Sequence, residues 1–173
     1  MTREEMQRHA NEISNKYVPA LFRSIAKFQQ ERFWKVNYKG RAEKLRAFEG
    51  DMIRAFCEAR LIVPVKVTPK QWTTNTTIRI PSLVNGDGHK AMPVFTDWKE
   101  LSAAYPCSEW SGWIWTIDDL LAAPDDTIVN CKSLGFVATK KMLKQMKEIN
   151  ETELQNAKTD RKKSKSTGDN SRN

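Results

Sequence analysis

The fold is decided by AMPVFTDWKELSAAYP (residues 91–106) and WSGWIWTIDDLLAAPDDTIVNCKSLGFVATKKMLKQ (residues 110–145). Asp97 followed by Glu100, and Thr116 followed by Asp119, have the spacing of a capping box that opens a helix. Thr139 occupies the same capping position before the last apolar helix pattern. These segments predict strands at 91–95, 113–115, 127–130 and 135–139, and helices at 98–104, at 117–123 and from 140 onward.

The segment before this stretch predicts a helix that leads into a strand. Between Leu45 and Ala59, apolar residues recur in steps of three and four, which predicts a helix over 41–60. The apolar run LIVPVKV (61–67) then predicts a strand. Because Pro64 has no N–H to donate, we expect it at a sheet edge or at a bulge.

A hairpin is predicted around Asn85-Gly86-Asp87-Gly88. Asn-Gly and Asp-Gly both favour the positive φ values of a tight type I′ turn. We therefore expect residues 76–84 to form one strand that pairs with 91–95. Hairpins mixed with separated helices indicate an α+β domain, in which helices pack on a mainly antiparallel or mixed sheet.

The two ends differ in pattern from residues 41–149, which we predict to form the α+β domain. Residues 1–40 predict a helical N-terminal extension, broken at Pro19. Its apolar residues at helical spacing are Met6, Ala10, Ile13 and Tyr17, and then Leu21, Phe22, Ile25 and Phe28. Residues 150–173 predict a basic, disordered tail, because apolar residues almost vanish from Lys158 onward.

Length, charge and cysteine content indicate a cytoplasmic protein. The 173 residues suit one domain with appendages, and the net charge of +8 divides into +5 for residues 1–60, −2 for 61–139 and +5 for 140–173. No apolar run approaches the roughly 18 residues that a membrane helix needs. Charged residues interrupt the first twenty positions, unlike a secretory signal. The three scattered cysteines form no disulfide framework.

Residues from about 45 to 146 resemble the N-terminal domain of the SseB family, the enhanced serine sensitivity proteins. The resemblance is carried by ARLIVPV (59–65), by NGDG (85–88), by MPVFT (92–96) and, most specifically, by PVFTDWKEL (93–101). Ile128-Val129-Asn130 is similar to the family's later strand, but Cys131-Lys132 replaces its proline and glycine. The resemblance implies an α+β fold, a bacterial source and no catalytic residue.

Tryptophans supply the candidate partner-binding surface. Strand alternation places Trp113 and Trp115 on one face, where they either fill the core or form a platform for a protein partner. Gly112 either lets a backbone or a ligand come close or marks a bulge. The partner-binding candidates are Trp98, Trp110, Trp113 and Trp115, together with the hairpin-tip residues Asn85, Asp87 and His89.

Catalytic and metal chemistry are not predicted. The two histidines, His9 and His89, and the scattered carboxylates do not assemble into an acid–base pair. Cys107 has no neighbouring cation in the sequence that would activate its thiol. The aspartates at 118–119 are explained by their favourable interaction with the helix dipole at a helix N-terminus. Those at 125–126 follow a proline and are typical of a turn. We expect a protein that is not an enzyme, with no catalytic residue, no bound metal and no cofactor.

The sequence thus favours a non-catalytic protein-binding or regulatory module that acts on a protein partner. One alternative is a toxin-neutralising or secretion-associated protein, which also acts by protein contact. The other is accessory nucleic-acid binding through the basic ends, with Arg161, Lys162, Lys163 and Lys165 as candidate phosphate contacts. The location of the positive charge at the ends, away from the predicted sheet, weakens this last alternative.

Overall fold

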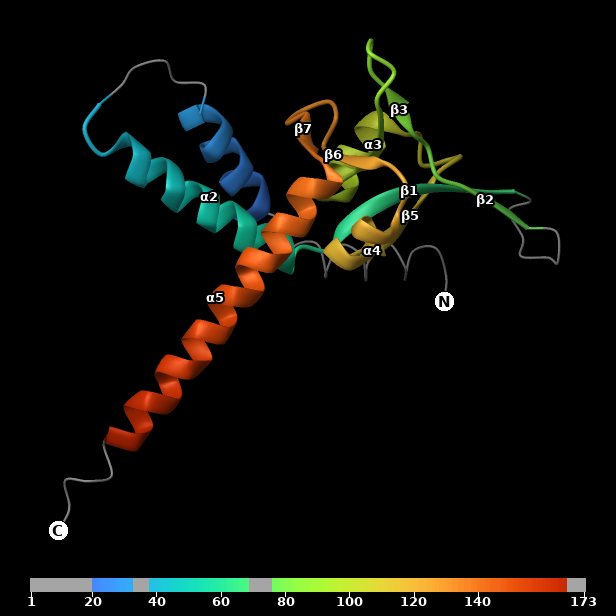
Figure 1. The fold of residues 1–173 in the computed structure, drawn as a ribbon. Helices are drawn as coiled ribbons and strands as arrows, with labels where there is room; N and C mark the ends of the chain where they lie inside the picture. The colour runs from blue at the N-terminus through green and yellow to red at the C-terminus, as the bar shows by residue number, and fades with distance from the viewer. Residues whose placement is uncertain (1–19, 33–37, 69–75, 168–173) are drawn as a thin grey trace.

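The computed structural model describes residues 20–32, 38–68 and 76–167, with side chains described as far as residue 160 (Figure 1). Its elements in chain order are a first helix at 20–32, α2 (Arg41–Glu58), β1 (Leu61–Thr68), β2 (Thr77–Arg79), β3 (Leu83–Val84), β4 (Lys90–Val94), α3 (Trp98–Ala104), β5 (Ser111–Trp115), α4 (Ile117–Ala122), β6 (Asp126–Val129), β7 (Phe136–Ala138) and α5 (Lys140–Thr167). The predicted α+β class is confirmed.

The strands form two sheets that meet at one point. One sheet is antiparallel with the order β2-β1-β5, and the other is mixed with the order β3-β4-β6-β7, because β4 and β6 run parallel. Ile62 of β1 and Phe95, just after β4, exchange two backbone hydrogen bonds of 2.8 Å that join the sheets. The backbone of Pro64, two residues further on, faces the same side as that of Ile62. The missing N–H of Pro64 therefore costs the β1–β5 ladder nothing.

The single strand predicted for residues 76–84 is wrong. The structure divides it into β2, which pairs with β1, and β3, which pairs with β4 in the other sheet. Pro81 lies between the two strands, where it cannot donate a ladder hydrogen bond. The chain therefore leaves one sheet at this proline and enters the other.

The β3–β4 hairpin is confirmed, but its turn is longer than the predicted two-residue type I′ turn. The Asn85 N–H donates to the His89 carbonyl at 3.0 Å, and the side-chain carbonyl of Asn85 accepts from the amides of Asp87 and His89. Gly88 adopts the left-handed conformation with φ of 79°. A left-handed glycine that closes a three-residue loop is an alternative hairpin geometry open to the same residues.

The helix caps follow the sequence closely. The Asp97 carboxylate accepts from the Glu100 N–H at 2.9 Å, and Thr116 and Asp119 form a complete capping box. The Thr139 hydroxyl accepts from the Met142 N–H at 3.2 Å at the start of α5. These caps satisfy N–H groups that a helix start leaves without partners.

Hydrophobic side chains pack on both faces of β1. Leu61 and Val63 join the larger core, to which the first helix, α2, α4, α5 and both sheets contribute. Ile62 points to the opposite face, where it packs with Phe95 and Leu101 beneath α3. The first helix belongs to the larger core, since Leu21, Ile25 and Phe28 are all buried. Residues 1–19 and 33–37 of the predicted extension lie outside the described residues.

Helix α5 continues beyond the point where its apolar pattern ends and projects away from the body (Figure 1). Ion pairs link Lys144 to Glu148 at 3.9 Å and Lys147 to Glu151 at 3.8 Å. These pairs support the first half of α5, and the absence of glycine and proline between Lys140 and Gly168 allows the helix to continue to Thr167, through a segment for which the sequence predicts no regular structure. In the part of the chain that the structure describes, no helix has the length and apolar character needed to cross a membrane.

Candidate functional site

The four candidate tryptophans do not share one surface. Trp113 and Trp115 pair with Val63 and Leu61 across the β1–β5 ladder, and Trp115 packs against the larger core. Trp98 packs on the opposite face of β5, in the small cluster beneath α3. The sheet itself therefore separates the rings that the sequence grouped together.

Gly112 allows the close contact between β5 and Trp98. A Cβ atom at this position would lie 2.4 Å from Cγ2 of Ile62 and 2.8 Å from Cη2 of the Trp98 ring. Side chains of the same chain make this approach, where the sequence predicts a backbone or a ligand, and the regular β1–β5 register through Gly112 contains no bulge. The buried indole N–H of Trp98 has no hydrogen-bond partner among the described residues.

Trp110 is held by neighbours within the chain. Its ring packs edge-on against Tyr105 with 4.9 Å between ring centroids, and the Lys66 ammonium lies 5.9 Å from its centroid. Lys66 also pairs with Glu109 at 2.7 Å. These contacts stabilise the loop between α3 and β5 and leave Trp110 half-buried.

The hairpin tip and the basic end lie apart from the tryptophans. Asn85, Asp87 and His89 are exposed at the tip of the β3–β4 hairpin, which rises from the body in Figure 1. The side chain of Asn85 is engaged in the turn itself. Residues 161–165, which include the candidate phosphate contacts, follow the α5 backbone, but their side chains lie outside the described residues.

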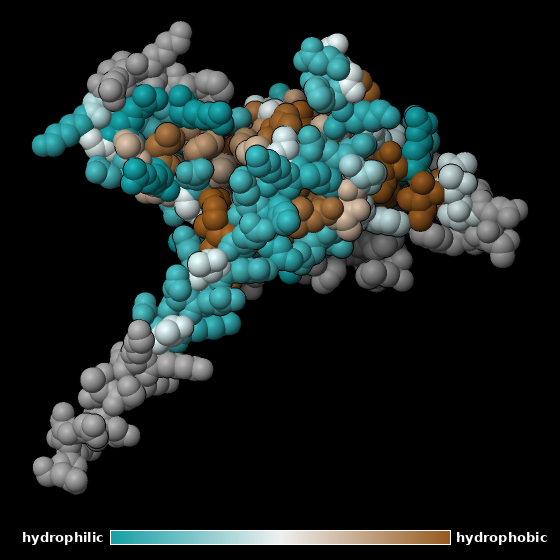
Figure 2. Space-filling view, viewed as in Figure 1, coloured by the Kyte–Doolittle hydropathy of each residue, from teal (hydrophilic) through white to brown (hydrophobic). Residues whose placement is uncertain are grey.

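A concave groove lies between the first helix, α2 and α5. Its volume is about 430 Å³, and its lining residues are Phe28, Arg32, Glu49, Met52, Ile53, Met142, Gln145, Met146, Glu148 and Ile149. Figure 2 shows hydrophobic surface exposed where α5 meets the two helices. The floor is apolar, and charged residues are confined to the rim.

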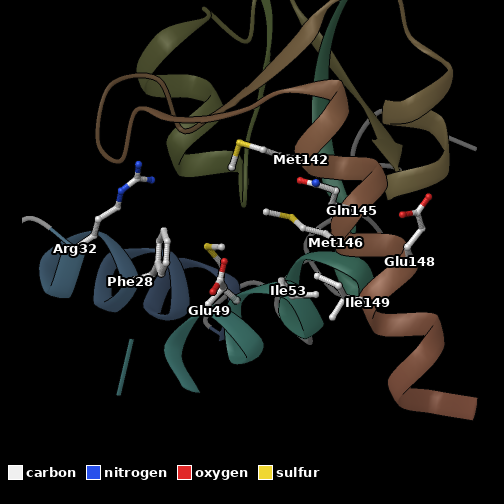
Figure 3. A pocket seen from close by; sticks show the side chains of 10 residues that line it. Phe28, Arg32, Glu49, Ile53, Met142, Gln145, Met146, Glu148 and Ile149 are labelled. Atoms are coloured by element: carbon white, nitrogen blue, oxygen red, sulfur yellow. The ribbon is translucent and has the colours of Figure 1, made fainter. Parts of the chain in front are cut away.

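The groove is lined by flexible side chains. In Figure 3, Met142 and Met146 extend from α5 toward the ring of Phe28, which rises from the first helix. Met52, Ile53, Met146 and Phe28 are all less than 9% exposed, whereas Ile149 at the groove edge is 44% exposed. Methionine has three rotatable bonds and a polarisable sulfur, so a methionine-rich wall can adapt to different apolar shapes.

A buried carboxylate stabilises the contact between the first helix and α2. Glu31, which is 3% exposed, accepts from the Tyr38 hydroxyl at 2.5 Å and pairs with Lys44 of α2 at 3.1 Å. The hydrogen bond from Tyr38 is the main reason that the pKa of Glu31 lies below its usual range, and Lys44 acts in the same direction against the effect of burial. Arg41 also donates to the Glu31 carbonyl at 3.2 Å.

Two long-range contacts hold α5 and the first helix in place. The Cys57 thiol of α2 lies 3.6 Å from the Met146 carbonyl of α5, in donor geometry. Burial raises the pKa of this thiol to about 11. The Gln29 amide donates to the Leu134 carbonyl at 3.3 Å, across 105 residues of sequence. These contacts fix the positions of the helices that form the walls of the groove.

The rim of the groove carries charges of both signs. Arg32 lies at the end formed by the first helix, and Glu49 and Glu148 lie along α2 and α5. Glu148 pairs loosely with Lys144, whereas Arg32 and Glu49 form no ion pair with any described residue. Among the described residues, no three His, Cys, Asp or Glu side chains gather as a metal site requires.

The model of the SseB protein N-terminal domain matches residues 39–126, which run from the start of α2 to the start of β6. The chain belongs to the SseB family. No curated protein and no solved structure matches it. The SseB match includes the α2 wall of the groove and leaves the first helix and α5 outside.

Sequence reasoning identified the side chains of the groove without finding the groove. The helix predicted from residue 140 onward carries Met142, Met146 and Ile149 on one face, and the stripe that ends at Phe28 is a second apolar helix face. The first helix, α2 and α5 each have an apolar face, and a small α+β domain needs fewer helices than this to cover one face of a sheet. This excess was the available signal, but the helical pattern does not say which faces meet.

Proposed function

We propose that the chain is a non-catalytic protein-binding module of the SseB family and that the groove between the first helix, α2 and α5 is its contact surface. The observation that supports the proposal is a concave, methionine-lined surface of about 430 Å³ with a charged rim. Apolar grooves between helices accept the apolar face of an amphipathic helix, with anchors spaced by three and four residues. The adaptable methionines suit such a ligand.

The groove is a better candidate contact surface than the tryptophans are. Trp98, Trp110 and Trp115 make contacts within the chain, and the first two lie on the opposite face of β5 from the third. The groove, in contrast, combines a buried floor with the exposed Ile149 at its edge. A desolvated centre surrounded by a polar rim is the general anatomy of a protein interface.

The test is isolation of the tagged chain from its native host, with bound proteins identified by mass spectrometry. We expect a stoichiometric protein partner that is lost in Ile149→Glu, since a carboxylate at the groove edge opposes insertion of an apolar face. Gln155→Glu adds the same single negative charge further along α5, at an exposed position outside the groove lining, and serves as the control. Retention of the partner by Ile149→Glu, with loss in Trp110→Ala or Trp113→Ala, contradicts the groove as the contact surface.

The same isolation tests the toxin-neutralising or secretion-associated alternative. Both functions act through protein contact, so the groove serves either one equally well. A toxin or a secreted substrate as the stoichiometric partner favours the alternative. A cytoplasmic enzyme or regulator supports the module proposed here.

Accessory nucleic-acid binding is a second candidate because α5 stays helical to Thr167. Lys158, Arg161, Lys162 and Lys165 follow one another at intervals of three, one and three residues, which assigns these four positions to one side of a helix. Cations so placed can neutralise successive phosphates, and the binding then falls steeply with salt. Deletion of residues 158–173 should abolish retention on a nucleic-acid column at low salt and leave partner binding intact.

A further inference from the structure

We propose that β5 pairs edge to edge, in antiparallel orientation, with β5 of a second copy of this chain. The β2-β1-β5 sheets of the two copies then join into one continuous sheet. The inference goes beyond the proposed function, because it concerns a different surface. In Figure 1, β5 lies on the opposite side of α5 from α2, which forms one wall of the groove.

The outer edge of β5 carries backbone groups that β1 does not use. In the described part of the chain, β5 pairs with β1 alone. Ile114 lies opposite Ile62 in this ladder, and the N–H and C=O of Ile62 both bond to Phe95 on the other side of β1. Opposite residues of an antiparallel pair either bond to each other or both point outward. The N–H and C=O of Ile114, and those of Gly112 two residues earlier, therefore point to the outer edge of β5.

This free edge is a window of two residues. Before it, the Trp110 N–H donates to the Pro106 carbonyl at 3.0 Å. After it, the Thr116 N–H donates to the Asp119 carboxylate at 2.8 Å, at the cap of α4. The two outward-facing residues between these bonds have backbone N–H and C=O groups without a partner among the described residues.

A second copy of the strand matches this window in one register. When Gly112 of each copy lies opposite Ile114 of the other, every outward N–H meets an outward C=O. A shift of either strand by two residues would place these groups against the engaged N–H of Trp110 or Thr116. The donors and acceptors are thus complementary between two copies of the same strand, which favours a second copy over an unrelated strand.

The same register brings the two Trp113 side chains together. The symmetry axis passes between them, because Trp113 lies midway between Gly112 and Ile114. Trp113 is half-buried and belongs to neither hydrophobic cluster of the described residues. Aromatic residues that lie opposite each other on adjacent strands stabilise a sheet. On the other face, Ile114 of one copy lies opposite Gly112, which has no side chain.

Charge permits this pairing, and size limits its strength. The SGWIW sequence of β5 contains no charged residue and no proline, which are features that keep sheet edges apart. The positive charge lies in residues 1–60 and 140–173, whereas residues 61–139, which include this sheet, carry −2. A strand of five residues is small beside the roughly 20–30 residues that each side of a stable interface contributes. We therefore expect a dimer that dissociates on dilution.

Cysteine cross-linking tests the register. In the proposed pair, the two Trp113 Cα atoms are about 4.5 Å apart, within the range that a disulfide bridges. The two Ser111 Cα atoms are about 13 Å apart, because Ser111 lies two residues from the axis. We expect mild oxidation to convert Trp113→Cys into a covalent dimer on a non-reducing gel. Ser111→Cys should give no more dimer than the unaltered chain, whose own cysteines set the background.

Hydrogen exchange tests the same pairing in the unaltered chain, where no substitution can disturb the fold. We expect exchange of the Gly112 and Ile114 amides to slow about fivefold at a concentration where about 80% of the chains are dimeric, since only the remaining monomers expose these amides. The Trp113 amide, which already bonds to β1, should not change.

Sedimentation measures the dimer itself. The mass of the unaltered chain should rise with concentration toward twice that of the monomer. Trp113→Lys should prevent this rise, because like charges would lie directly opposite each other at the axis. Val137→Lys places the same charge at an exposed residue of another edge strand, β7, and serves as the control.

Other outcomes overturn the inference. A chain that stays monomeric at every concentration, with unchanged exchange at Gly112 and Ile114, does not form this dimer. Equal cross-linking of both cysteine variants contradicts the register, and a dimer that Ile149→Glu abolishes and Trp113→Lys leaves intact uses the groove instead. If the chain is monomeric and Trp113→Lys loses the isolated partner protein, the edge binds a strand of that partner. Partner isolation with Ile149→Glu concerns the groove alone, so the proposed function stands or fails separately.

Discussion

The most specific prediction about stability concerns Asn130. It follows β6 with a left-handed φ of 47° and is fully buried. Its side-chain carbonyl accepts from the Thr96 N–H at 3.0 Å, and its amide donates to the Thr96 hydroxyl at 2.8 Å. The residue therefore stabilises the end of β6 against the turn that leads from β4 into α3.

The cost of Asn130→Ala can be estimated from these contacts. The buried Thr96 N–H loses its partner, at about 1–3 kcal/mol, and the hydroxyl keeps only its bond to Asp97, at about 1 kcal/mol. Alanine in the left-handed region adds about 1 kcal/mol. The sum is about 3–5 kcal/mol, which is a large part of the stability of a typical domain.

Asn130→Gly separates the two contributions, because glycine adopts a positive φ without strain. We expect it to lose about 2–4 kcal/mol, roughly 1 kcal/mol less than alanine. Urea denaturation at neutral pH, followed by tryptophan fluorescence, gives the free energy of unfolding for each form. A glycine variant as stable as the unaltered chain would refute the role of the side-chain hydrogen bonds. Equal losses in both variants would refute the backbone contribution.

Three further predictions concern packing and titration. Gly112→Ala should lower the free energy of unfolding by about 1–3 kcal/mol, because the added methyl group overpacks the contact with Ile62 and Trp98. Gly50→Ala should raise the free energy of unfolding by up to about 1 kcal/mol, because Gly50 is helical and has nothing within 4 Å of an added Cβ. Urea titrations that rank the two variants the other way contradict this account. The lowered pKa of Glu31 stabilises the fold above the pKa of the unfolded state, and this contribution disappears as the pH falls through the folded pKa. Urea midpoints of Glu31→Gln and the unaltered chain should therefore differ at pH 7 and converge toward pH 3, and a constant difference argues against the carboxylate. In a variant with Cys57 as its sole cysteine, thiol-labelling rates should keep rising up to about pH 11; a plateau near pH 9 contradicts the burial of this thiol.

Local chemistry explains why so much of the fold could be predicted. A cap such as that of Thr116 depends on a residue three positions away, and the alternation of LIVPVKV depends on immediate neighbours. The errors arose where the outcome depends on distant partners. Residues 76–80 and 83–84 favour a strand, but the choice between β1 and β4 as partners is settled by the sheets on either side of Pro81.

The candidate site was harder to predict for the same reason. Trp113 and Trp115 were correctly assigned to one face of a strand, but their relation to Trp98 depends on where α3 packs. The groove requires Phe28 to meet Met146, more than a hundred residues later in the chain. Helical periodicity identifies an apolar face and does not identify what covers it.

The groove is a consequence of how this chain completes the SseB core. Within the matched region, Met52, Ile53 and Phe56 of α2 are each less than 7% exposed, and the first helix and α5, which lie outside the match, help to cover them. Two helices that cover one helix from different sides leave a gap where their own apolar faces diverge. Because the added helices form two of its three walls, the groove can change in shape and charge while the matched fold stays intact. If the groove is the contact surface proposed above, partner choice is encoded in the first helix and α5, and the structure of the SseB domain itself constrains it little.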